Sequence, residues 1–494
     1  MNPLLNLVYT PLSEWDTKAR QAFADVLSAR YQRVRAEPLL EPRADGERRF
    51  QLRVNTSGGE PFAALIGPDQ ERSGPYGGMS FVVFPSTESG VPALIAMGVG
   101  THGLAPDEDI LGRPGHGRKM RAIAAWLRKR GAEFAWAKQD PVRIDLKLPK
   151  ALAQPLADWK PACDRYGAVL YAVFAPPRER TSSSDALVTD ALTAYLDVFF
   201  DERLIGVMAG ARDDAERVKR GWTATALPAT EADSVRELLA HRKYVVLEGP
   251  PGTGKTDLAT RLLRDVYEGH GRAIQFHPGT TYESFVGGLA PQEGGAMGFR
   301  FAPTAGHLLE AAEAADADPT RPYLLLIDEI NRADLAKVLG EAIHLFEAGQ
   351  HDRELHLAHA FPTTGRRLRL PPNLHVLGTM NSADRSIAIL DLAVRRRFAF
   401  VSMWPQLDVV ERHGGPRAQQ AFHDLQSIFL EHAAGDAFAL MPGHAYFLAD
   451  DAHIDVRLRT EVAPLLREYL GQGYVSGFAD EVQAFLDSIA ADAV

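Results

Sequence analysis

Residues 249–256 read Gly249-Pro250-Pro251-Gly252-Thr253-Gly254-Lys255-Thr256, and this octapeptide decides the architecture of the second half of the chain. An apolar run, 244–248, comes directly before it, and a helical pattern opens directly after it. Glycines let backbone amides turn inward around phosphate oxygens, and the N-terminus of the following helix adds partial positive charge. Lys255 would reach the β- and γ-phosphates, and the Thr256 hydroxyl would ligate Mg²⁺. The octapeptide therefore predicts a loop that binds the phosphates of a nucleotide.

An apolar run ending in two carboxylates follows about 70 residues later. Residues 323–329 read Tyr-Leu-Leu-Leu-Ile-Asp-Glu. At the carboxyl edge of a parallel sheet, Asp328 would hold Mg²⁺ beside the nucleotide, and Glu329 would polarise the attacking water. After a phosphate-binding loop, this acidic pair indicates hydrolysis of a nucleoside triphosphate.

Two further elements fit the same site. The apolar run 374–379 leads into Asn381, and if this strand lies beside the loop strand, Asn381 reaches the γ-phosphate or the attacking water. Residues 395–397 are three adjacent arginines between a helix and a strand. They fit arginine fingers that project into a neighbouring subunit's site and neutralise transition-state charge. The alternative is a solvated helix end.

From residue 241 the pattern alternates short apolar strands with helices, which is typical of a parallel sheet covered on both faces. The expected strands are 244–248, 273–277, 323–328, 374–379 and 398–401. We therefore expect an α/β nucleotide-binding core over 241–402 and a helical lid over 403–494.

The first 175 residues mix helix and strand signals and predict a separate α+β recognition domain. Helices are expected at 12–35 and 116–131, and strands at 48–54, 61–67, 79–84, 92–99, 141–148 and 167–174. The Pro- and Ser-rich stretch 175–185 is the expected linker, within a linker and mainly helical connector over 176–240.

Composition places the chain among ordinary globular proteins. Its 494 residues are 46% hydrophobic and 24% charged, and no apolar run approaches the 18 residues of a membrane helix. The N-terminus lacks the pattern of a signal peptide. One cysteine, Cys163, excludes an intramolecular disulfide and a Cys-rich zinc site, so a cytoplasmic location is expected.

Charge is unevenly distributed, which suggests different partners for the two parts of the chain. Residues 1–180 carry a net charge of +5, and residues 181–494 carry −15. A basic cluster beside glycines offers candidate contacts to nucleic-acid phosphates: Arg113, Arg118, Lys119 and Arg121. The alternative is a helix whose basic face is simply solvated.

Other motifs of the front domain are weaker indications of function. Trp126, Trp136 or Tyr76 could stack on a flipped modified base, although core packing is the favoured interpretation. Asp145-Leu146-Lys147 matches half of a nuclease motif, but the tripeptide is common and a built-in nuclease is disfavoured. Cys163 is most simply a buried apolar residue.

Together the four elements resemble the AAA+ ATPases, and the residues between them resemble the McrB family. The similar segments are 275–291 (Gln-Phe-His-Pro-Gly-Thr-Thr-Tyr-Glu-Ser-Phe-Val-Gly-Gly-Leu-Ala-Pro), 328–341, 378–398, 443–447 (Gly-His-Ala-Tyr-Phe) and 461–469. McrB proteins are NTPase motors of modification-dependent restriction systems. They form hexameric rings and recruit a McrC-type endonuclease that stimulates hydrolysis. The resemblance covers about 241–470 and implies the same organisation here.

The resemblance also implies roles for single residues. Asn381 would be the sensor, and Arg397, together with Arg396, the finger acting in trans. Asn331 and Arg332 would couple the nuclease or a neighbouring subunit to hydrolysis; the alternative is a helix-start cap and surface charge. McrB uses GTP and most AAA+ relatives use ATP. The motif Asn-Ser-Ala-Asp at 381–384 does not separate the two bases.

The expected function is therefore a McrB-like ring motor in DNA restriction or anti-phage defence, with a front domain that recognises the target. A MoxR-like ATPase that remodels a protein target is the alternative, and DNA binding by residues 1–180 would discriminate the two. A nucleotide-gated scaffold is weakened because Lys255, Asp328, Glu329 and Asn381 are all present.

Overall fold

The computed structural model describes residues 2–31, 50–57, 59–68, 70, 75–294, 298–350, 352–383 and 392–491. The chain divides into two compact units. Unit 1 comprises residues 1–227 with 430–432, and unit 2 comprises residues 228–429 with 433–494. Within the described residues, no helix has the length and hydrophobicity needed to cross a membrane.

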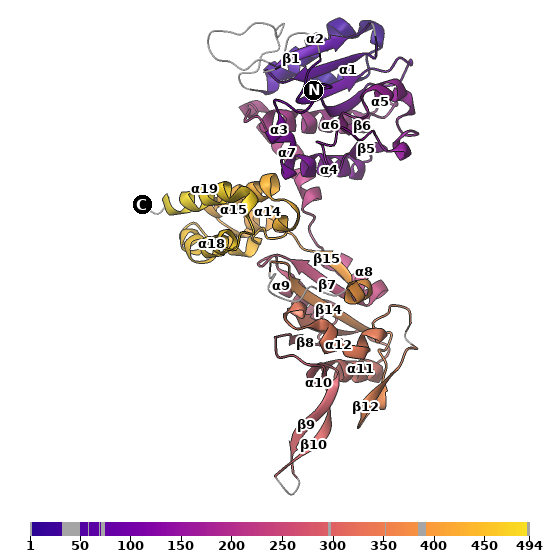
Figure 1. Cartoon of the computed structure of the whole chain (residues 1–494), viewed down its shortest axis with the longest axis vertical. Helices are drawn as coiled ribbons and strands as arrows, with labels where there is room; N and C mark the ends of the chain where they lie inside the picture. The colour runs from indigo at the N-terminus through magenta and orange to yellow at the C-terminus, as the bar shows by residue number, and fades with distance from the viewer. Residues whose placement is uncertain are drawn as a thin grey trace. The chain divides into compact units, whose positions relative to one another are not determined.

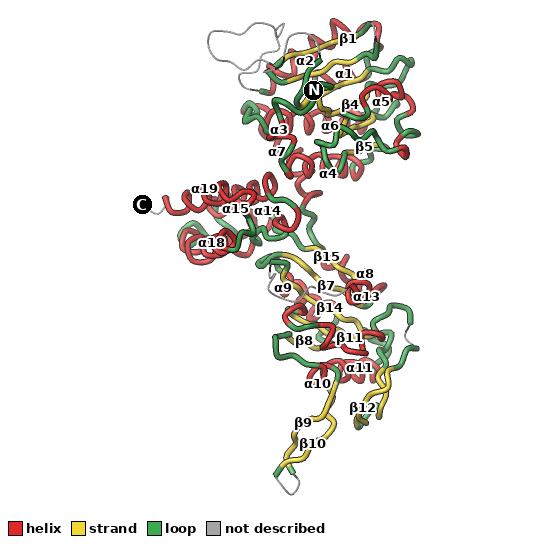
Figure 2. Tube along the Cα trace, viewed as in Figure 1, coloured by secondary structure: helices red, strands yellow, loops and turns green. Residues whose placement is uncertain are grey.

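Unit 1 is built on an antiparallel sheet with the strand order β1-β2-β3-β4-β6-β5 (Figure 2). Its strands are β1 (Gln51–Asn55), β2 (Phe62–Ile66), β3 (Met79–Phe84), β4 (Leu94–Val99), β5 (Phe134–Ala137) and β6 (Leu170–Ala175). Successive side chains of a β-strand point to opposite faces of the sheet. Alternating residues of the central strands therefore pack into different apolar clusters on the two faces.

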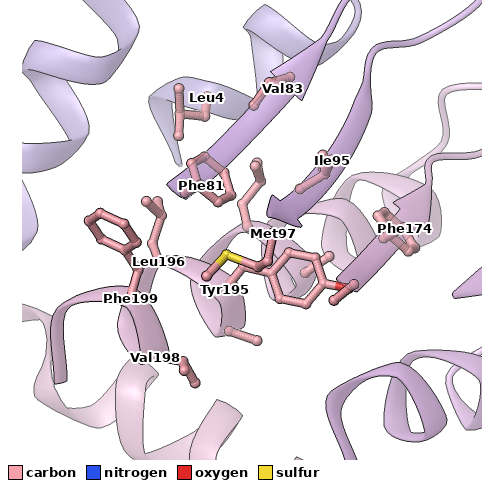
Figure 3. Packing of buried hydrophobic residues seen from close by; sticks show 14 of the residues in the cluster. Leu4, Phe81, Val83, Ile95, Met97, Phe174, Tyr195, Leu196, Val198 and Phe199 are labelled. Atoms are coloured by element: carbon pink, nitrogen blue, oxygen red, sulfur yellow. The ribbon is translucent and has the colours of Figure 1, made fainter. Parts of the chain in front are cut away.

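The larger of these clusters lies between the sheet and helices. The helices of this unit are α1 (Pro3–Val8), α2 (Trp15–Arg30), α3 (Glu108–Leu111), α4 (Pro114–Lys129), α5 (Lys160–Tyr166), α6 (Ser182–Asp201) and α7 (Arg212–Ala226). Figure 3 shows Phe81 and Met97 of the sheet with Tyr195 and Phe199 of α6. On the other face, Val82 and Phe84 pack with residues of η3 (Ala157–Trp159) and α5.

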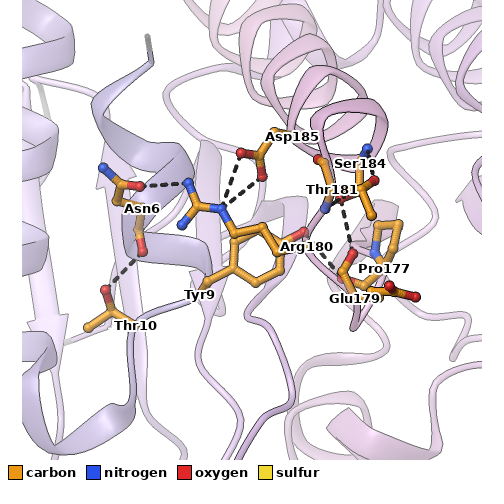
Figure 4. Close-up of polar contacts among 9 residues, drawn as sticks. All are labelled: Asn6, Tyr9, Thr10, Pro177, Glu179, Arg180, Thr181, Ser184 and Asp185. Carbon is orange, nitrogen blue, oxygen red and sulfur yellow. Dashed lines mark hydrogen bonds and ion pairs between the residues drawn. The ribbon is translucent and has the colours of Figure 1, made fainter.

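The stretch predicted as a linker is integrated into unit 1. Arg180 donates to Asn6 of α1 at 2.8 Å and to Asp185 at 2.9 Å, and the Tyr9 hydroxyl donates to the Pro177 carbonyl at 3.2 Å (Figure 4). Thr181 caps α6, whose apolar residues enter the core. The structure therefore differs from the expected connector because α6 supplies apolar surface that the sheet needs for burial.

A second difference concerns the strand expected at 141–148. That stretch forms turns, and the edge strand that pairs with β6 on the side away from β4 is β5, through Phe134↔Ala175 and Ala137↔Ala172. Pro141 lacks the N–H that a ladder position uses, whereas the β5 residues keep theirs. Asp145 consequently lies in an exposed turn, ion-paired with Arg143 at 2.8 Å.

Unit 2 contains a five-stranded parallel sheet with the order β15-β7-β14-β11-β8 (Figure 1). The strands are β7 (Tyr244–Gly249), β8 (Gly271–Gln275), β11 (Tyr323–Asp328), β14 (Leu374–Asn381) and β15 (Ala399–Ser402). Apolar clusters cover both of its faces, as the continuous apolar runs predict. Since all strands are parallel, the carboxyl ends of β7, β14 and β11 meet at one edge.

Helices and hairpins surround this sheet. They are α8 (Ala232–Arg242), α9 (Lys255–Arg261) with the π-helical η5 (Leu262–Val266), α10 (Tyr282–Phe285), hairpin β9 (Gly287–Glu293)–β10 (Phe299–Ala305), α11 (His307–Ala317), η6 (Ile330–Arg332), α12 (Leu335–Leu339), η7 (Gly340–Leu345), hairpin β12 (Leu355–Phe361)–β13 (Gly365–Leu368) and α13 (Leu392–Arg397).

The last part of unit 2 is helical. The helical elements after β15 are α14 (Leu407–His413), α15 (Pro416–His432), whose residues 430–432 are assigned to unit 1, α16 (Gly435–Phe438), η8 (His444–Phe447), α17 (Ile454–Arg457), η9 (Leu458–Val462), α18 (Ala463–Gly471), η10 (Ser476–Phe478) and α19 (Ala479–Ala491). The predicted fold class is confirmed: an α+β front part, an α/β core with a parallel sheet, and a helical end.

Candidate nucleotide-hydrolysis site

The loop between β7 and α9 has the geometry that its glycines permit. Gly252 and Gly254 adopt φ of +80° and +79°, in the left-handed region that side chains disfavour. Gly254 is the N-cap of α9, so Lys255 and Thr256 open that helix. The buried Thr253 hydroxyl donates to the Pro250 carbonyl at 3.0 Å and braces the turn. The backbone amides at the start of α9 therefore lie where an anion is stabilised.

Lys255 points back into its own loop. Its ammonium donates to the carbonyls of Gly249 at 2.9 Å and Pro250 at 2.7 Å, and 9% of the residue is exposed. Desolvation lowers the pKa of Lys255 from 10.5 to about 8, and the charges of Glu329 and Asp328 oppose that shift. Burial therefore destabilises the charged form of Lys255, and a phosphate beside the amine would stabilise that form.

Thr256 and Asp328 meet at the edge of the sheet. The Thr256 hydroxyl lies 2.9 Å from Oδ1 of Asp328. A hydroxyl and a carboxylate oxygen are the hard ligands that Mg²⁺ takes together with phosphate oxygens. The two residues fit a Mg²⁺ ion, which when bound would neutralise charge on the phosphates.

Glu329 follows Asp328 but leaves the strand direction. Its backbone has φ 55° and ψ 45°, an uncommon left-handed conformation for glutamate. The N–H of Glu329 donates to the Thr379 hydroxyl at 3.1 Å, and Oε2 lies 3.4 Å from Nε of the exposed Arg332. Thr379 was not among the residues that the sequence pointed to, although its place two residues before Asn381 puts it on the same strand face.

Asn381 stands directly beside the phosphate loop. In the register of the sheet, Asn381 pairs with Gly249, the first residue of the loop. The side-chain amide of Asn331 donates to the Asn381 carbonyl at 3.4 Å, and Asn331 is 4% exposed. Asn331 is therefore buried against Asn381, whereas Arg332 reaches the surface.

The arginine cluster forms the last turn of α13. Arg395 and Arg396 are exposed, and the Arg395 guanidinium stands 4.9 Å from the ring centre of Phe400. Arg397 is half-buried and donates to the Ala393 carbonyl at 2.8 Å. The motif residues Asp384, Arg385, Ser386, Leu390 and Asp391 lie outside the described residues.

The helical part of unit 2 contacts the phosphate loop through its backbone. Gly443 N–H donates to the Pro251 carbonyl, and Ala445 N–H donates to the Gly252 carbonyl, both at 2.9 Å. A Cβ at Gly443 would come within 2.0 Å of the Gly252 carbonyl carbon. The sequence indicated a lid segment here but not this contact, since it depends on packing between distant segments.

These groups together support an in-line attack of water on the terminal phosphate. The loop amides and Lys255 hold and neutralise the phosphates. The Glu329 carboxylate can orient water and accept its proton, and Asn381 can fix that water or a γ-phosphate oxygen. A finger from a second subunit would supply the positive charge that the transition state needs.

The predicted nucleic-acid contacts of unit 1 lie on α4 (Arg118, Lys119 and Arg121) and at its N-cap (Arg113). Lys119 is paired with Glu202 at 3.1 Å, and Glu202 also accepts from His116 at 2.7 Å. Burial raises the pKa of Glu202, but its charge interactions and hydrogen bonds with His116 and Lys119 outweigh burial and lower the pKa to about 2. Lys119 is thus engaged inside the fold. Arg113, Arg118 and Arg121 are half-buried, and Arg121 donates to the Gln139 carbonyl.

A cavity of about 290 Å³ opens on the other face of the unit 1 sheet. Aromatic side chains and two arginines line it: Phe62, Tyr76, Phe84, Tyr166, Arg53 and Arg165. The Arg53 guanidinium lies 5.1 Å from the centre of the Tyr76 ring, and Arg165 lies 5.6 Å from that of Tyr166. Of the three aromatic residues that the sequence offered, Tyr76 lines this cavity, whereas Trp126 packs in the core.

Comparisons with known proteins found one family model, relatives in restriction systems and more distant solved structures. A family model described as AAA domain (dynein-related subfamily) matches residues 244–398. The chain is 31% identical over 269 residues to the type IV methyl-directed restriction enzyme EcoKMcrB subunit of Escherichia coli K12, covering 49% of this chain and 57% of that protein.

A second relative is the type II restriction enzyme BsuMI component YdiS of Bacillus subtilis 168. It is 26% identical over 194 residues, which cover 31% of this chain and 55% of that protein. The chain thus matches little more than half the length of either relative. Among solved structures, NtrX of Brucella abortus aligns at 14% identity with a TM-score of 0.27, over 57% of this chain and 59% of that one.

Proposed function

We propose that the chain is a AAA+ nucleoside triphosphatase and the ring-forming motor of a DNA restriction system, as its similarity to an AAA domain model and to a McrB subunit supports. It would hydrolyse GTP or ATP with Mg²⁺ and work with a separate McrC-like endonuclease in the cytoplasm. The observation that carries the hydrolytic part is the adjacency of three strand ends, which brings Lys255, Glu329 and Asn381 to one edge.

Two features support the partners in this proposal. Both relatives named above are restriction components. The exposed Arg396 and half-buried Arg397 at the end of α13 are suited to complete a neighbour's site, which makes a ring necessary for turnover. Arg332, exposed beside Glu329, is the residue through which a partner would influence hydrolysis.

The decisive test of the motor is steady-state hydrolysis of ATP and of GTP by the purified chain, with and without a candidate McrC-like nuclease subunit. Turnover of either nucleotide that rises with the nuclease is the expected result. Turnover that is insensitive to the nuclease would contradict it and favour a MoxR-like ATPase that remodels proteins.

We also propose that unit 1 recognises the DNA target through the cavity lined by Tyr76 and Tyr166. Aromatic faces stack on bases, and Arg53 and Arg165 at the same cavity suit the adjoining phosphates. A cavity of about 290 Å³ is of the size class that holds a small ring system.

The recognition proposal is tested with Tyr166→Ala in the full chain. Loss of one stacking partner is expected to weaken DNA binding by roughly tenfold or more. Tyr166→Phe keeps the ring and should bind like wild type. Unchanged binding by Tyr166→Ala would place the DNA contact elsewhere. If neither the wild type nor Tyr166→Phe binds DNA without the nuclease, unit 1 does not recognise the DNA target.

A further inference from the structure

The hydroxyl of Thr379 joins the two acidic residues of the site. It lies 2.5 Å from Oδ1 of Asp328 and 3.1 Å from the backbone nitrogen of Glu329. A threonine hydroxyl has one hydrogen, so it donates to the carboxylate and accepts from the amide. Thr379 is 2% exposed, which excludes competing water. The directions of both hydrogen bonds are therefore fixed.

This pairing accounts for the conformation of Glu329. A non-glycine residue with φ 55° and ψ 45° costs about 1 kcal/mol and persists where the surroundings enforce it. The hydrogen bond from the Glu329 N–H to Thr379 ties the backbone at the point where it leaves β11. The direction of the Glu329 side chain follows from that turn, so the hydroxyl indirectly aims the carboxylate.

Thr379 also belongs to the strand that carries the sensor. Thr379 and Asn381 are two residues apart on β14, so their side chains share one face. Both positions pair with β7, Thr379 with Leu247 and Asn381 with Gly249. A displacement of the end of β14 would therefore move Asn381 and the anchor of Glu329 together.

We propose that Thr379 is a positioning residue that couples the sensor Asn381 to the orientation of Glu329. The inference rests on the proposed roles of Glu329 and Asn381 in hydrolysis. Contact between Asn381 and the γ-phosphate sets the end of β14, and Thr379 transmits that position to Glu329. Nucleotide binding, which depends on the phosphate loop, does not need this hydroxyl.

The test compares Thr379→Val, which keeps the shape and removes the hydroxyl, with Thr379→Ser, which keeps the hydroxyl. We expect Thr379→Val to lower kcat about 10- to 100-fold, within the range of a misplaced general base, and to change nucleotide Kd by less than about threefold. Thr379→Ser should stay within about threefold of wild-type kcat. Thr193→Val, at another buried threonine, is the matched control.

A double variant separates this idea from the assignment of Glu329. If Thr379 acts through Glu329, adding Thr379→Val to Glu329→Gln causes no further loss of kcat. An additional loss in the double variant, or wild-type kcat in Thr379→Val, would overturn the proposal. Wild-type turnover in Glu329→Gln alone would instead overturn the proposed site.

Folding is checked by thermal unfolding of each variant with nucleotide and Mg²⁺ present. Should Thr379→Val fail to fold, Thr379→Cys replaces the hydroxyl with a weak hydrogen-bonding group of similar size. The same loss of kcat at unchanged Kd is expected for it, and full activity of the cysteine variant would count against the proposal.

Discussion

The Thr256 hydroxyl and the Asp328 carboxylate lie 2.9 Å apart, although 72 residues separate them along the chain. Thr256 opens α9, and Asp328 closes β11. Their contact exists because β14 brings β11 to the strand that feeds the phosphate loop.

Glu329→Gln should abolish turnover and retain bound nucleotide. The amide keeps the size of the side chain but cannot accept a proton from water, so a loss of at least 10²-fold in kcat is expected. Nucleotide bound after gel filtration, together with the oligomeric state, is the measurement. Wild-type kcat in this variant would show that another group acts as the base.

Arg397→Ala should stop hydrolysis and leave binding intact, with a loss of about 10³-fold in kcat. A finger acts in a neighbour's site, so mixing Arg397→Ala with Lys255→Ala should restore partial activity. Mixed rings contain interfaces where an intact loop meets an intact arginine. Rescue that fails at every mixing ratio would argue for an arginine acting within its own subunit.

Nucleotide affinity should fall as pH rises above about 8. Burial lowers the pKa of Lys255 to about 8, and bound phosphates favour its charged form. Binding above pH 8 is therefore accompanied by proton uptake at Lys255, and the affinity falls as the pH rises, by at most tenfold per pH unit. Calorimetry in two buffers of different ionisation enthalpy detects the proton. An affinity that stays constant to pH 9.5 without uptake would contradict this coupling.

The same pKa shift has a defined sign for stability. Between pH 8 and 10.5, the unfolded chain binds more protons at Lys255 than the folded chain does. The contribution of this residue to the free energy of unfolding therefore rises with pH through that range, and its cost is fully present below pH 8. Replacing Lys255 with Met should remove this slope.

Gly443→Ala should weaken nucleotide binding while most of unit 2 stays folded. A Cβ at this position would stand 2.0 Å from the Gly252 carbonyl carbon, so the loop or the segment 443–445 has to move. We expect at least a tenfold weaker Kd for nucleotide. Gly471→Ala is a matched control, because nothing lies within 4 Å of its added Cβ. Equal affinities in the two variants would show that the contact with Gly252 is dispensable.

Much of the site could be read from local sequence. The glycines at 252 and 254 do adopt positive φ, and the apolar runs of unit 2 do form parallel strands. The adjacency of Asn381 to the loop was conditional on strand order, which no local pattern encodes. The roles of Thr379 and Gly443 were missed because their meaning depends on groups 50 or more residues away.

In the front half, too, local patterns predicted some elements and contacts between distant residues decided others. Strands β2, β3 and β4 were expected near their observed positions, because turns and apolar alternation mark them locally. The strand expected at 141–148 was wrong, since the place beside β6 is taken by β5. Lys119 carried the same local signal as its basic neighbours, and its ion pairs with the distant Glu202 and Glu431 distinguish it.

By itself, the sequence determined where the phosphate loop, the acidic pair, Asn381 and the arginine cluster stand, since each is a short pattern whose chemistry depends on adjacent residues. The tertiary structure alone decided which strands are neighbours, that Thr379 joins Asp328 to Glu329, and that α6 completes the core of unit 1. Strand pairing and core packing are long-range choices, made by burying apolar surface and satisfying hydrogen bonds between segments far apart in the chain.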